Sequence, residues 1–248
     1  MHLLRTRFKK DIVCEFLPPL KNSKKQKVII NCAGAPGVPS KKNDLALFFA
    51  KKGYWFFSIR YRGSWESGGE FLGKSPHMDV LDVLDGLSKG FVDAWSEKKY
   101  KVIPDEVVLL GGSFGGPAVL LNSNDERVNK VIAISPVIDW TYPSKYEPLD
   151  WMYGFIKRAF GGGYRLTKKN WNKLSNGEFY NPIGNTESID GSKILIIHAE
   201  DDKVCSIIPV KKFIKLTNAK YRFYKRGGHS LKFDKPPILD HIINFIKS

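Results

Sequence analysis

Short runs of consecutive apolar residues, each followed by a helical pattern, constrain the fold of this chain more than any other feature. Four of these runs are VII at 28–30, VVLL at 107–110, VIAI at 131–134 and ILII at 194–197. An uninterrupted apolar run is typical of a parallel strand that is covered on both faces. Because strands and helices alternate, the sequence predicts an α/β fold, with a mostly parallel, doubly wound sheet flanked by helices.

The pattern predicts six strands and four main helices. One helix is expected to be long, because Leu81, Leu84, Leu87, Phe91 and Trp95 recur at helical spacing. The expected strands are 27–31, 55–60, 106–110, 130–134, 193–198 and 221–225, and the expected helices are 44–52, 78–98, 206–216 and 237–247.

The segment from about residue 140 to 190 interrupts this alternation. It has no clear strand, it is rich in aromatic residues, and its helical pieces, 149–160 and 168–174, are short. A long insertion between two strands is usually functional or disordered, and the aromatic residues argue against disorder. We therefore expect a small cap over the sheet, within a single domain that spans residues 1–248.

Composition limits the classes of protein and partner. The net charge is +15, but lysine far outnumbers arginine and the lysines are scattered, which favours a solvated surface over specific nucleic-acid binding. No apolar stretch approaches the length of a membrane span, and charge interrupts the N-terminal residues, so neither a transmembrane segment nor a signal peptide is expected. Three widely spaced cysteines form no zinc pattern and indicate a reducing, cytoplasmic compartment.

The six residues 111–116, GGSFGG, lie between an apolar run and a helical pattern of small residues. Gly111, Ser113 and Gly115 fit the Gly-x-Ser-x-Gly pattern of a nucleophile elbow, in which a strained turn lifts the serine Oγ above the sheet. Residues two before and two after the serine nearly touch there, so a Cβ at either position would clash. We expect Gly112 and Gly116 to relieve further crowding, and Ser113 to be a nucleophile.

A serine hydroxyl needs a neighbouring base to become an effective nucleophile. Of the five histidines, His229 lies in the turn GGHS between the last expected strand and the last expected helix. That turn opens at the carboxyl edge of the sheet, where Ser113 is also expected. His229 is therefore the predicted base.

The imidazole in turn needs a carboxylate to fix its tautomer. The expected strand 193–198 is followed by three acids, Glu200, Asp201 and Asp202. We favour Asp202, and Asp201 remains an alternative. Asp139, which follows the preceding strand, is a second alternative. The order serine, aspartate, histidine suits a sheet of this kind.

An oxyanion forms when the serine attacks a carbonyl group, and two N–H donors are expected to stabilise it. The residue after the nucleophile, Phe114, should supply one backbone N–H. The small residues in the loop 32–37, CAGAPG, leave its backbone accessible, and we expect the Ala35 N–H to be the second donor.

Several motifs together resemble a known family. They are CAGAPG at 32–37, RYRGSWESGG at 60–69, GGSFGG at 111–116, IIHAEDDKV at 196–204 and GGHS at 227–230. Along residues 27–232 the chain resembles the α/β-hydrolase superfamily, and within it the catalytic domain of the prolyl oligopeptidase family without its β-propeller. The resemblance implies Ser113, Asp202 and His229 as the triad, with Ala35 and Phe114 as oxyanion donors.

The expected activity is that of a serine hydrolase that forms an acyl-enzyme, with no metal and no cofactor. Carboxylic esters of small molecules are favoured over short peptides, because esters have better leaving groups and need less anchoring. A serine peptidase and a non-catalytic binding protein are the alternatives. Aromatic residues are expected to line an apolar substrate pocket, with Trp65, Trp140 and Trp151 as its candidates.

Overall fold

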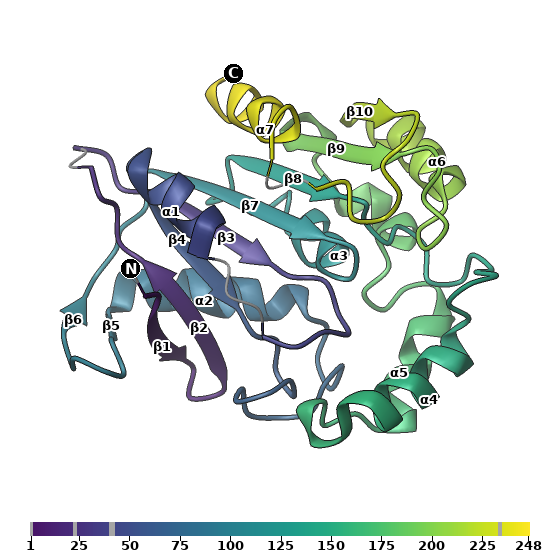
Figure 1. Ribbon diagram of the computed structural model, residues 1–248, viewed down its shortest axis with the longest axis horizontal. Helices are drawn as coiled ribbons and strands as arrows, with labels where there is room; N and C mark the ends of the chain where they lie inside the picture. The colour runs from purple at the N-terminus through teal and green to yellow at the C-terminus, as the bar shows by residue number, and fades with distance from the viewer. Residues whose placement is uncertain (1, 22–23, 40–42, 233–234) are drawn as a thin grey trace.

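The computed structural model describes residues 2–21, 24–39, 43–232 and 235–248. At its centre lies an eight-stranded sheet with the strand order β1-β2-β4-β3-β7-β8-β9-β10 (Figure 1). The strands are β1 Leu4–Phe8, β2 Ile12–Leu17, β3 Lys27–Cys32, β4 Tyr54–Ile59, β7 Glu106–Gly112, β8 Lys130–Ile134, β9 Ile194–Ala199 and β10 Lys220–Tyr224.

Six neighbouring strands of this sheet, β4, β3, β7, β8, β9 and β10, are parallel to one another, as the sequence predicts. The central residues of β3, β7, β8 and β9 are buried, because helices cover both faces of this part of the sheet, whereas the edge strand β10 is largely exposed. Because β3, β7, β8 and β9 are parallel, their carboxyl ends lie at the same edge of the sheet (Figure 1). The doubly wound, mostly parallel sheet is confirmed.

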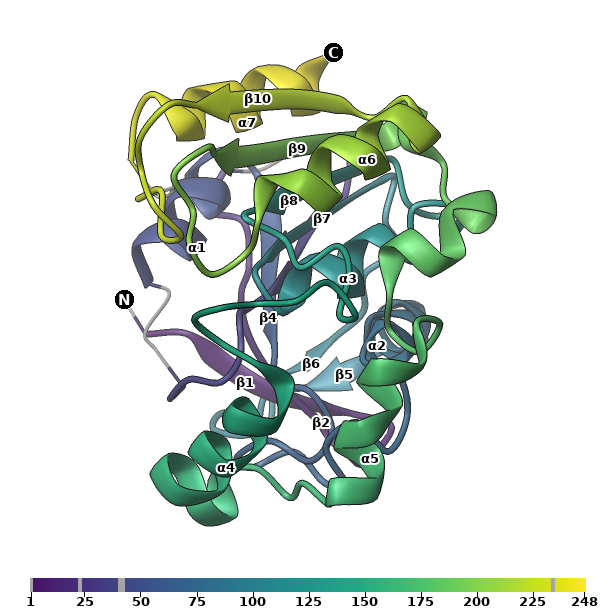
Figure 2. The same ribbon diagram turned by 90° about the vertical axis from the view of Figure 1, so that its right-hand side faces the viewer.

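Five helices cover the two faces of the sheet. Helices α1 (Asn43–Lys51) and α7 (Ile238–Lys247) bury their apolar sides in one core. On the opposite face, α2 (His77–Lys89), α3 (Gly115–Leu120) and α6 (Ile207–Thr217) pack into a second core (Figure 2). The sheet thus forms the middle of three layers.

Two parts of the N-terminal half differ from the prediction. The antiparallel strands β1 and β2 were not expected, and β2 extends the sheet by pairing with β4. The helix expected over 78–98 ends at Lys89, because Gly90 has a φ of 95°. The chain then forms a short hairpin, β5 (Phe91–Val92) with β6 (Lys99–Tyr100). Phe91 is buried there in an aromatic cluster, so its spacing was misread as helical.

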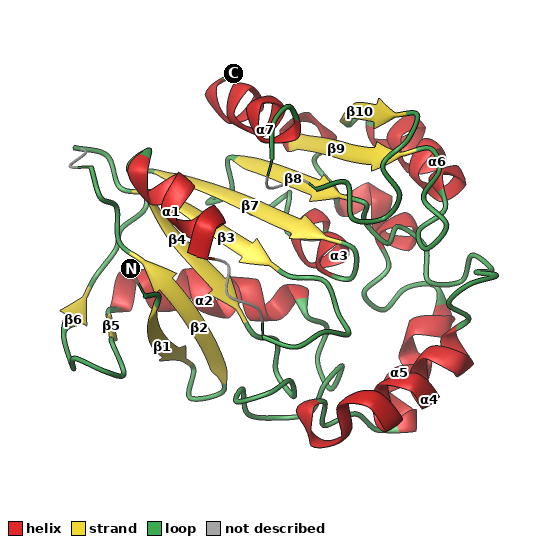
Figure 3. Ribbon diagram, viewed as in Figure 1, coloured by secondary structure: helices red, strands yellow, loops and turns green. Residues whose placement is uncertain are grey.

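The segment 140–190 contains helices α4 (Leu149–Phe160) and α5 (Lys168–Asn172) and the short turns η1 (Gly161–Gly163), η2 (Lys173–Asn176) and η3 (Pro182–Ser188). A further turn, η4 (Gly191–Lys193), leads into β9. Helices α4 and α5 lie beyond the carboxyl ends of the parallel strands (Figures 1 and 3). We refer to residues 140–190 as the cap segment.

Candidate active site

Ser113 lies on a tight turn between β7 and α3. Its φ of 51° is in the left-handed region, which side chains other than glycine rarely adopt. Three backbone hydrogen bonds hold it in this conformation. Its N–H donates to the Ile134 carbonyl over 3.0 Å, and its carbonyl accepts from Gly116 and Val137 over 2.9 and 3.1 Å. A strained residue that is fixed on several sides is typical of a functional site.

The glycines around Ser113 differ in how strictly the fold needs them. A Cβ on Gly111 would lie 2.3 Å from the Gly115 carbonyl oxygen, and one on Gly115 would lie 2.0 Å from the Cys32 oxygen. A Cβ on Gly116 would lie 2.4 Å from Pro136 Cβ, whereas one on Gly112 would make an ordinary contact of 3.5 Å. The expected crowding at Gly112 is therefore wrong, and the other three glycines are required by close approach.

His229 lies in the turn between β10 and α7, and its Nδ1 is 2.9 Å from Oδ2 of Asp202. Because an ionised carboxylate can only accept hydrogen bonds, Nδ1 carries the proton and donates it. The other oxygen, Oδ1, accepts from the backbone N–H groups of Val204 and Cys205 over 2.8 and 3.0 Å. This arrangement fixes the tautomer of His229 and leaves its Nε2 able to accept a proton.

The environment of Asp202 keeps it ionised. Burial alone would raise the pKa of this carboxyl. The hydrogen bond and charge of His229, together with the N–H groups of Val204 and Cys205, outweigh burial and lower the pKa of Asp202 below its usual range.

The two alternative acids contact other groups. Oδ1 of Asp201 accepts a hydrogen bond from the Gly228 N–H over 2.8 Å, so Asp201 supports the loop that carries His229. Oδ1 of Asp139 accepts from the backbone N–H and the hydroxyl of Thr141, over 2.9 and 2.7 Å. Of these three acids, all in the described part of the chain, Asp202 is the one that hydrogen-bonds His229.

A second histidine, His198, lies behind Asp202 and was not predicted to belong to the site. It is fully buried at the end of β9, and its Nε2 lies 2.9 Å from the Cys205 carbonyl and 3.7 Å from Asp202 Oδ2. Burial lowers its pKa, which favours the neutral imidazole. A histidine that closes an otherwise apolar strand was the signal in the sequence.

The loop 33–37 packs directly against the elbow. A Cβ on Gly34 would lie 3.3 Å from Ser113 Cβ, so glycine allows this close approach. Within the described residues, the N–H groups of Ala35 and Phe114 donate no hydrogen bond to another backbone or side-chain atom. Ala35 and Phe114 also line the same cavity as Ser113.

Three aromatic side chains hold the loop 33–37. The Tyr61 hydroxyl donates to the Ala33 carbonyl over 2.9 Å, and the Trp65 Nε1–H donates to the Gly37 carbonyl over 2.9 Å. The Tyr164 hydroxyl accepts from the Gly37 N–H over 2.9 Å and donates to its carbonyl over 3.0 Å. These contacts fix the loop from residues that are distant in sequence.

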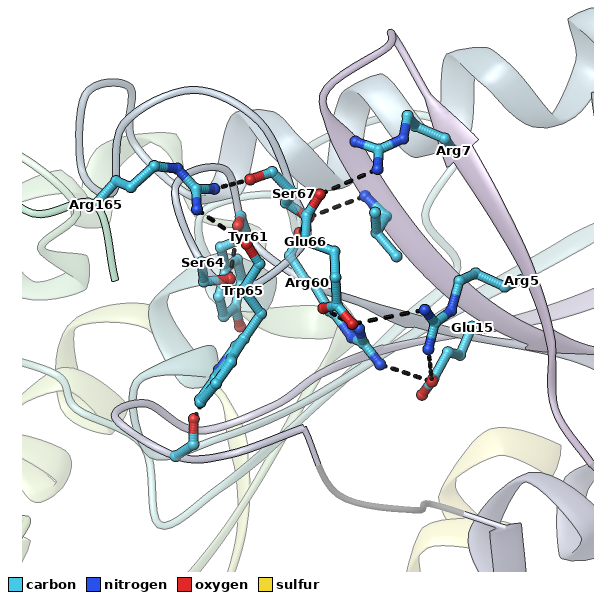
Figure 4. Close-up of polar contacts among 12 residues, drawn as sticks. Arg5, Arg7, Glu15, Arg60, Tyr61, Ser64, Trp65, Glu66, Ser67 and Arg165 are labelled. Carbon is cyan, nitrogen blue, oxygen red and sulfur yellow. Dashed lines mark hydrogen bonds and ion pairs between the residues drawn. The ribbon is translucent and has the colours of Figure 1, made fainter. Parts of the chain in front are cut away.

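The loop 60–69 is itself fixed from both sides (Figure 4). On one side, the Arg60 guanidinium binds Glu15 over 2.7 Å and also contacts Glu66. On the other side, Arg165 donates to the carbonyl of Trp65 over 2.9 Å and to that of Ser67. The Trp65 side chain thus lies on a rigid support.

A cavity of about 700 Å³ lies beside Ser113. Its wall is formed by the loop 33–37, the elbow, the chain from 136 to 149, parts of α4 and α5, and residues 202–206 after β9. Most of the lining side chains are apolar, as is usual for small-molecule sites. Ser113, Asp202 and much of the cap segment therefore meet in one hollow.

The structure corrects the expected role of two of the three tryptophans. Trp140 lines the cavity, packs against the ring of Phe114 and donates from Nε1 to the Tyr180 carbonyl over 2.8 Å. Trp65 lies outside the lining, because its Nε1 is directed to the loop 33–37. Trp151 also lies outside it, half-exposed and stacked on Phe155. Spacing alone did not show which ring faced the cavity.

Other features of the chain were searched over the described residues. No group of three or more histidine, cysteine or acidic residues there could hold a metal ion. No helix of that part is both long and apolar enough to cross a bilayer. Cys14, Cys32 and Cys205 are free and buried.

Comparison with known proteins gives a family and a fold. Residues 42–246 match the model of the prolyl oligopeptidase family. A comparison with curated proteins gives no significant match.

Solved structures show the fold. An esterase of Pyrococcus furiosus is 17% identical, with a TM-score of 0.67, over 99% of this chain and 89% of the esterase. The α/β hydrolase GrgF of a Penicillium species is 16% identical, with a TM-score of 0.67, over 99% of this chain and 97% of GrgF. An acylaminoacyl peptidase of Pyrococcus horikoshii is 16% identical, with a TM-score of 0.66, and this chain spans 40% of it.

These likenesses confirm the α/β-hydrolase fold that the sequence motifs suggested. The resemblance to one family within that fold is confirmed by the family match, which covers most of the chain. The chain belongs to the prolyl oligopeptidase family and is a serine hydrolase.

Proposed function

We propose that this chain is a serine esterase that cleaves carboxylic esters of small molecules. Ser113 is the nucleophile, His229 the general base and then the general acid, and Asp202 the acid that orients His229. The observation that carries the proposal is the pairing of His229 with Asp202 over 2.9 Å at the same sheet edge as a serine with a φ of 51°.

The reaction follows from these groups. Ser113 Oγ forms a bond to the carbonyl carbon of the ester while His229 Nε2 takes the hydroxyl proton. The tetrahedral intermediate expels the alcohol, which receives that proton, and an acyl-enzyme remains. Water then attacks the acyl carbon and gives a proton to His229, and that proton returns to Ser113 Oγ as the carboxylic acid leaves.

The oxyanion of the intermediate is held by the N–H groups of Ala35 and Phe114 in this proposal. Both residues line the cavity beside Ser113, which supports the assignment. One missing oxyanion donor typically costs about 100- to 1,000-fold in kcat. The contacts of Tyr61, Trp65 and Tyr164 with the loop 33–37 explain how its backbone is held in place for this role.

Esters are favoured over peptides because, among the described residues, it is this cavity that would hold the substrate. The described residues form no β-propeller that could grip a peptide, so little remote binding energy is available to expel a poor amide leaving group. A peptidase acting on short peptides is the second candidate, and family membership favours it. A non-catalytic binding protein is the third.

We also propose a cytoplasmic location. All three cysteines are free, which suits a reducing compartment.

Covalent labelling tests the proposed nucleophile. The wild type should react with a fluorophosphonate at one site, and Ser113→Ala should lose both the label and nearly all turnover while it keeps its thermal unfolding transition. Equal labelling of Ser113→Ala, measured by intact mass, would contradict the assignment.

A paired substrate series tests the bond that is cleaved. We expect kcat/KM for p-nitrophenyl esters to exceed that for matched aminoacyl p-nitroanilides by about a hundredfold, which corresponds to roughly 2.7 kcal/mol in the barrier. Equal efficiency on both series would favour the peptidase. Labelling without turnover of any ester or amide would favour the binding protein.

A further inference from the structure

Glu147 lines the cavity that contains Ser113 and Asp202. It lies just before α4, and its backbone N–H donates to the Ser144 hydroxyl over 3.0 Å. The side chain is half-buried, yet among the described residues its carboxylate makes no hydrogen bond and no ion pair. Partial burial of a carboxylate that has no partner is unfavourable unless a ligand or a water molecule forms a hydrogen bond or an ion pair with it.

The carboxylate of Glu147 interacts electrostatically with two of the proposed catalytic groups. Burial raises its pKa, the charge of His229 opposes this change, and the charge of Asp202 adds to it. Glu147 also contributes to the raised pKa of the Cys205 thiol, after burial and Asp202. Glu147, Asp202, Cys205 and Ser113 all line one cavity, so a bound molecule can contact Glu147 and the nucleophile together.

The other charged side chains of the lining are occupied or exposed. Asp202 is paired with His229, and Asp139 accepts hydrogen bonds from Thr141. Lys145 and Lys203 are exposed, and Lys203 Nζ lies 5.9 Å from the centre of the Tyr146 ring. In the described lining, Glu147 is therefore the half-buried charge that a bound molecule can neutralise.

The cavity that Glu147 lines is also rich in aromatic rings. Trp140, Tyr142 and Tyr146 all line the cavity together with Glu147. The face of an aromatic ring attracts a cation, and the attraction strengthens as water is excluded. A cavity lined by an anionic carboxylate and several aromatic rings is a suitable environment for an ammonium group.

We propose that Glu147 binds a cationic group of the substrate, so that the enzyme selects esters with an ammonium group close to the scissile carbonyl. This inference rests on the proposed esterase function. Glu147 is then a specificity residue: it contacts the substrate, and it is separate from the groups that make and break bonds.

Isosteric ester pairs test the charge alone. Butyrylcholine is compared with 3,3-dimethylbutyl butyrate, in which a tert-butyl group replaces the trimethylammonium group of the alcohol. The p-nitrophenyl esters of 4-(trimethylammonio)butanoic acid and 5,5-dimethylhexanoic acid make the same comparison in the acyl group. For at least one pair, the wild type should show a kcat/KM about tenfold or more in favour of the cation.

Variants assign that preference to Glu147. Glu147→Gln should bring the ratio within each pair close to one, and Glu147→Asp should keep a preference for the cation. Asp150→Asn is the matched control. It removes one negative charge three residues away, from a side chain that is 92% exposed and paired with Lys168 over 2.7 Å, and it should keep the wild-type ratio.

Several outcomes would overturn the inference. Turnover of the neutral esters by the wild type, without a preference for the cation in either pair, would refute the role of Glu147 and leave the esterase function standing. An unchanged ratio in Glu147→Gln, or an equal loss in Asp150→Asn, would also refute it. No turnover of any ester, with no fluorophosphonate labelling, would refute the proposed function and this inference together.

Discussion

Asp202 accepts a hydrogen bond from His229 Nδ1 over 2.9 Å, although the two residues are separated by 27 positions and lie on loops that follow different strands. The contact depends on β9 and β10 being parallel neighbours, since both loops then leave the sheet at the same edge. The preceding residue, Asp201, accepts from Gly228 and so holds the second loop in place. Two consecutive acids thus act on one loop in different ways.

This geometry predicts unequal effects of three matched substitutions. Asp202→Asn should lower kcat by about 10⁴, because the amide favours the wrong tautomer of His229. Asp201→Asn retains an oxygen that can accept from Gly228, and Asp139→Asn retains one for Thr141, so each should cost less than about tenfold. Steady-state kinetics on one p-nitrophenyl ester would measure all three, and a crippling effect of Asp139→Asn would move the acid to the preceding strand.

The elbow predicts a sharp difference between two glycines. Gly115→Ala places a Cβ 2.0 Å from the Cys32 oxygen and should destabilise the fold by about 1–3 kcal/mol or more while displacing Ser113. Gly112→Ala makes a contact of 3.5 Å and should change stability by less than about 1 kcal/mol. Thermal unfolding and the rate of fluorophosphonate labelling would compare them, and equal losses in both would contradict the steric account.

The two tryptophans near the site should affect different kinetic constants. Trp65→Phe removes the N–H that holds Gly37 and should lower kcat about tenfold, with little change in the preference for acyl length. Trp140→Ala enlarges the cavity and should shift the preference toward longer acyl chains, at about 25 cal/mol per Å² of apolar surface buried. Trp151→Ala is the control. If Trp65→Phe changes the preference for acyl length and Trp140→Ala does not, then Trp65 rather than Trp140 contacts the acyl group.

The preference for a cationic substrate should depend on pH. Glu147 attracts a cation only when it is ionised, and burial, opposed by His229 and assisted by Asp202, raises its pKa. The ratio of kcat/KM for the cationic ester to that for the neutral ester should therefore be highest at high pH, where Glu147 is ionised. As the pH falls, the ratio should decrease earlier, at a higher pH, than it would for an exposed glutamate. The ratio cancels ionisations of the catalytic groups that affect both esters alike. A ratio that stays constant while the pH falls well below the usual glutamate range would exclude Glu147 as its source.

The central sheet could be predicted because buried parallel strands are almost uniformly apolar, and the elbow because its glycines are close in sequence. Strands β1 and β2 escaped prediction because charged residues interrupt them, as in LRTRF and IVCEFL. The hairpin after Gly90 was missed because Phe91 and Trp95 continue a helical spacing by chance, whereas one ring is buried and the other is exposed.

The candidate site could likewise be predicted only where its residues belong to local sequence motifs. Ser113, His229 and Asp202 lie in short local motifs whose chemistry is readable from neighbouring residues. The aromatic support of the loop 33–37 depends on Tyr61, Trp65 and Tyr164, and its last contact spans 127 positions, so no local pattern reveals it. Glu147 is one of many acids in the sequence, and its importance arises from burial without a partner.

The contacts of Arg165 have a consequence for protein engineering. Its backbone N–H donates to the Gly63 carbonyl over 2.7 Å, its carbonyl accepts from Phe71 over 2.9 Å, and its guanidinium donates to the carbonyls of Trp65 and Ser67. The cap segment and the loop 63–71 are thereby joined like neighbouring strands. A chimera that exchanges the cap segment alone would lose these hydrogen bonds, including the one that holds the Trp65 backbone. The cap segment and residues 63–71 should therefore be exchanged together.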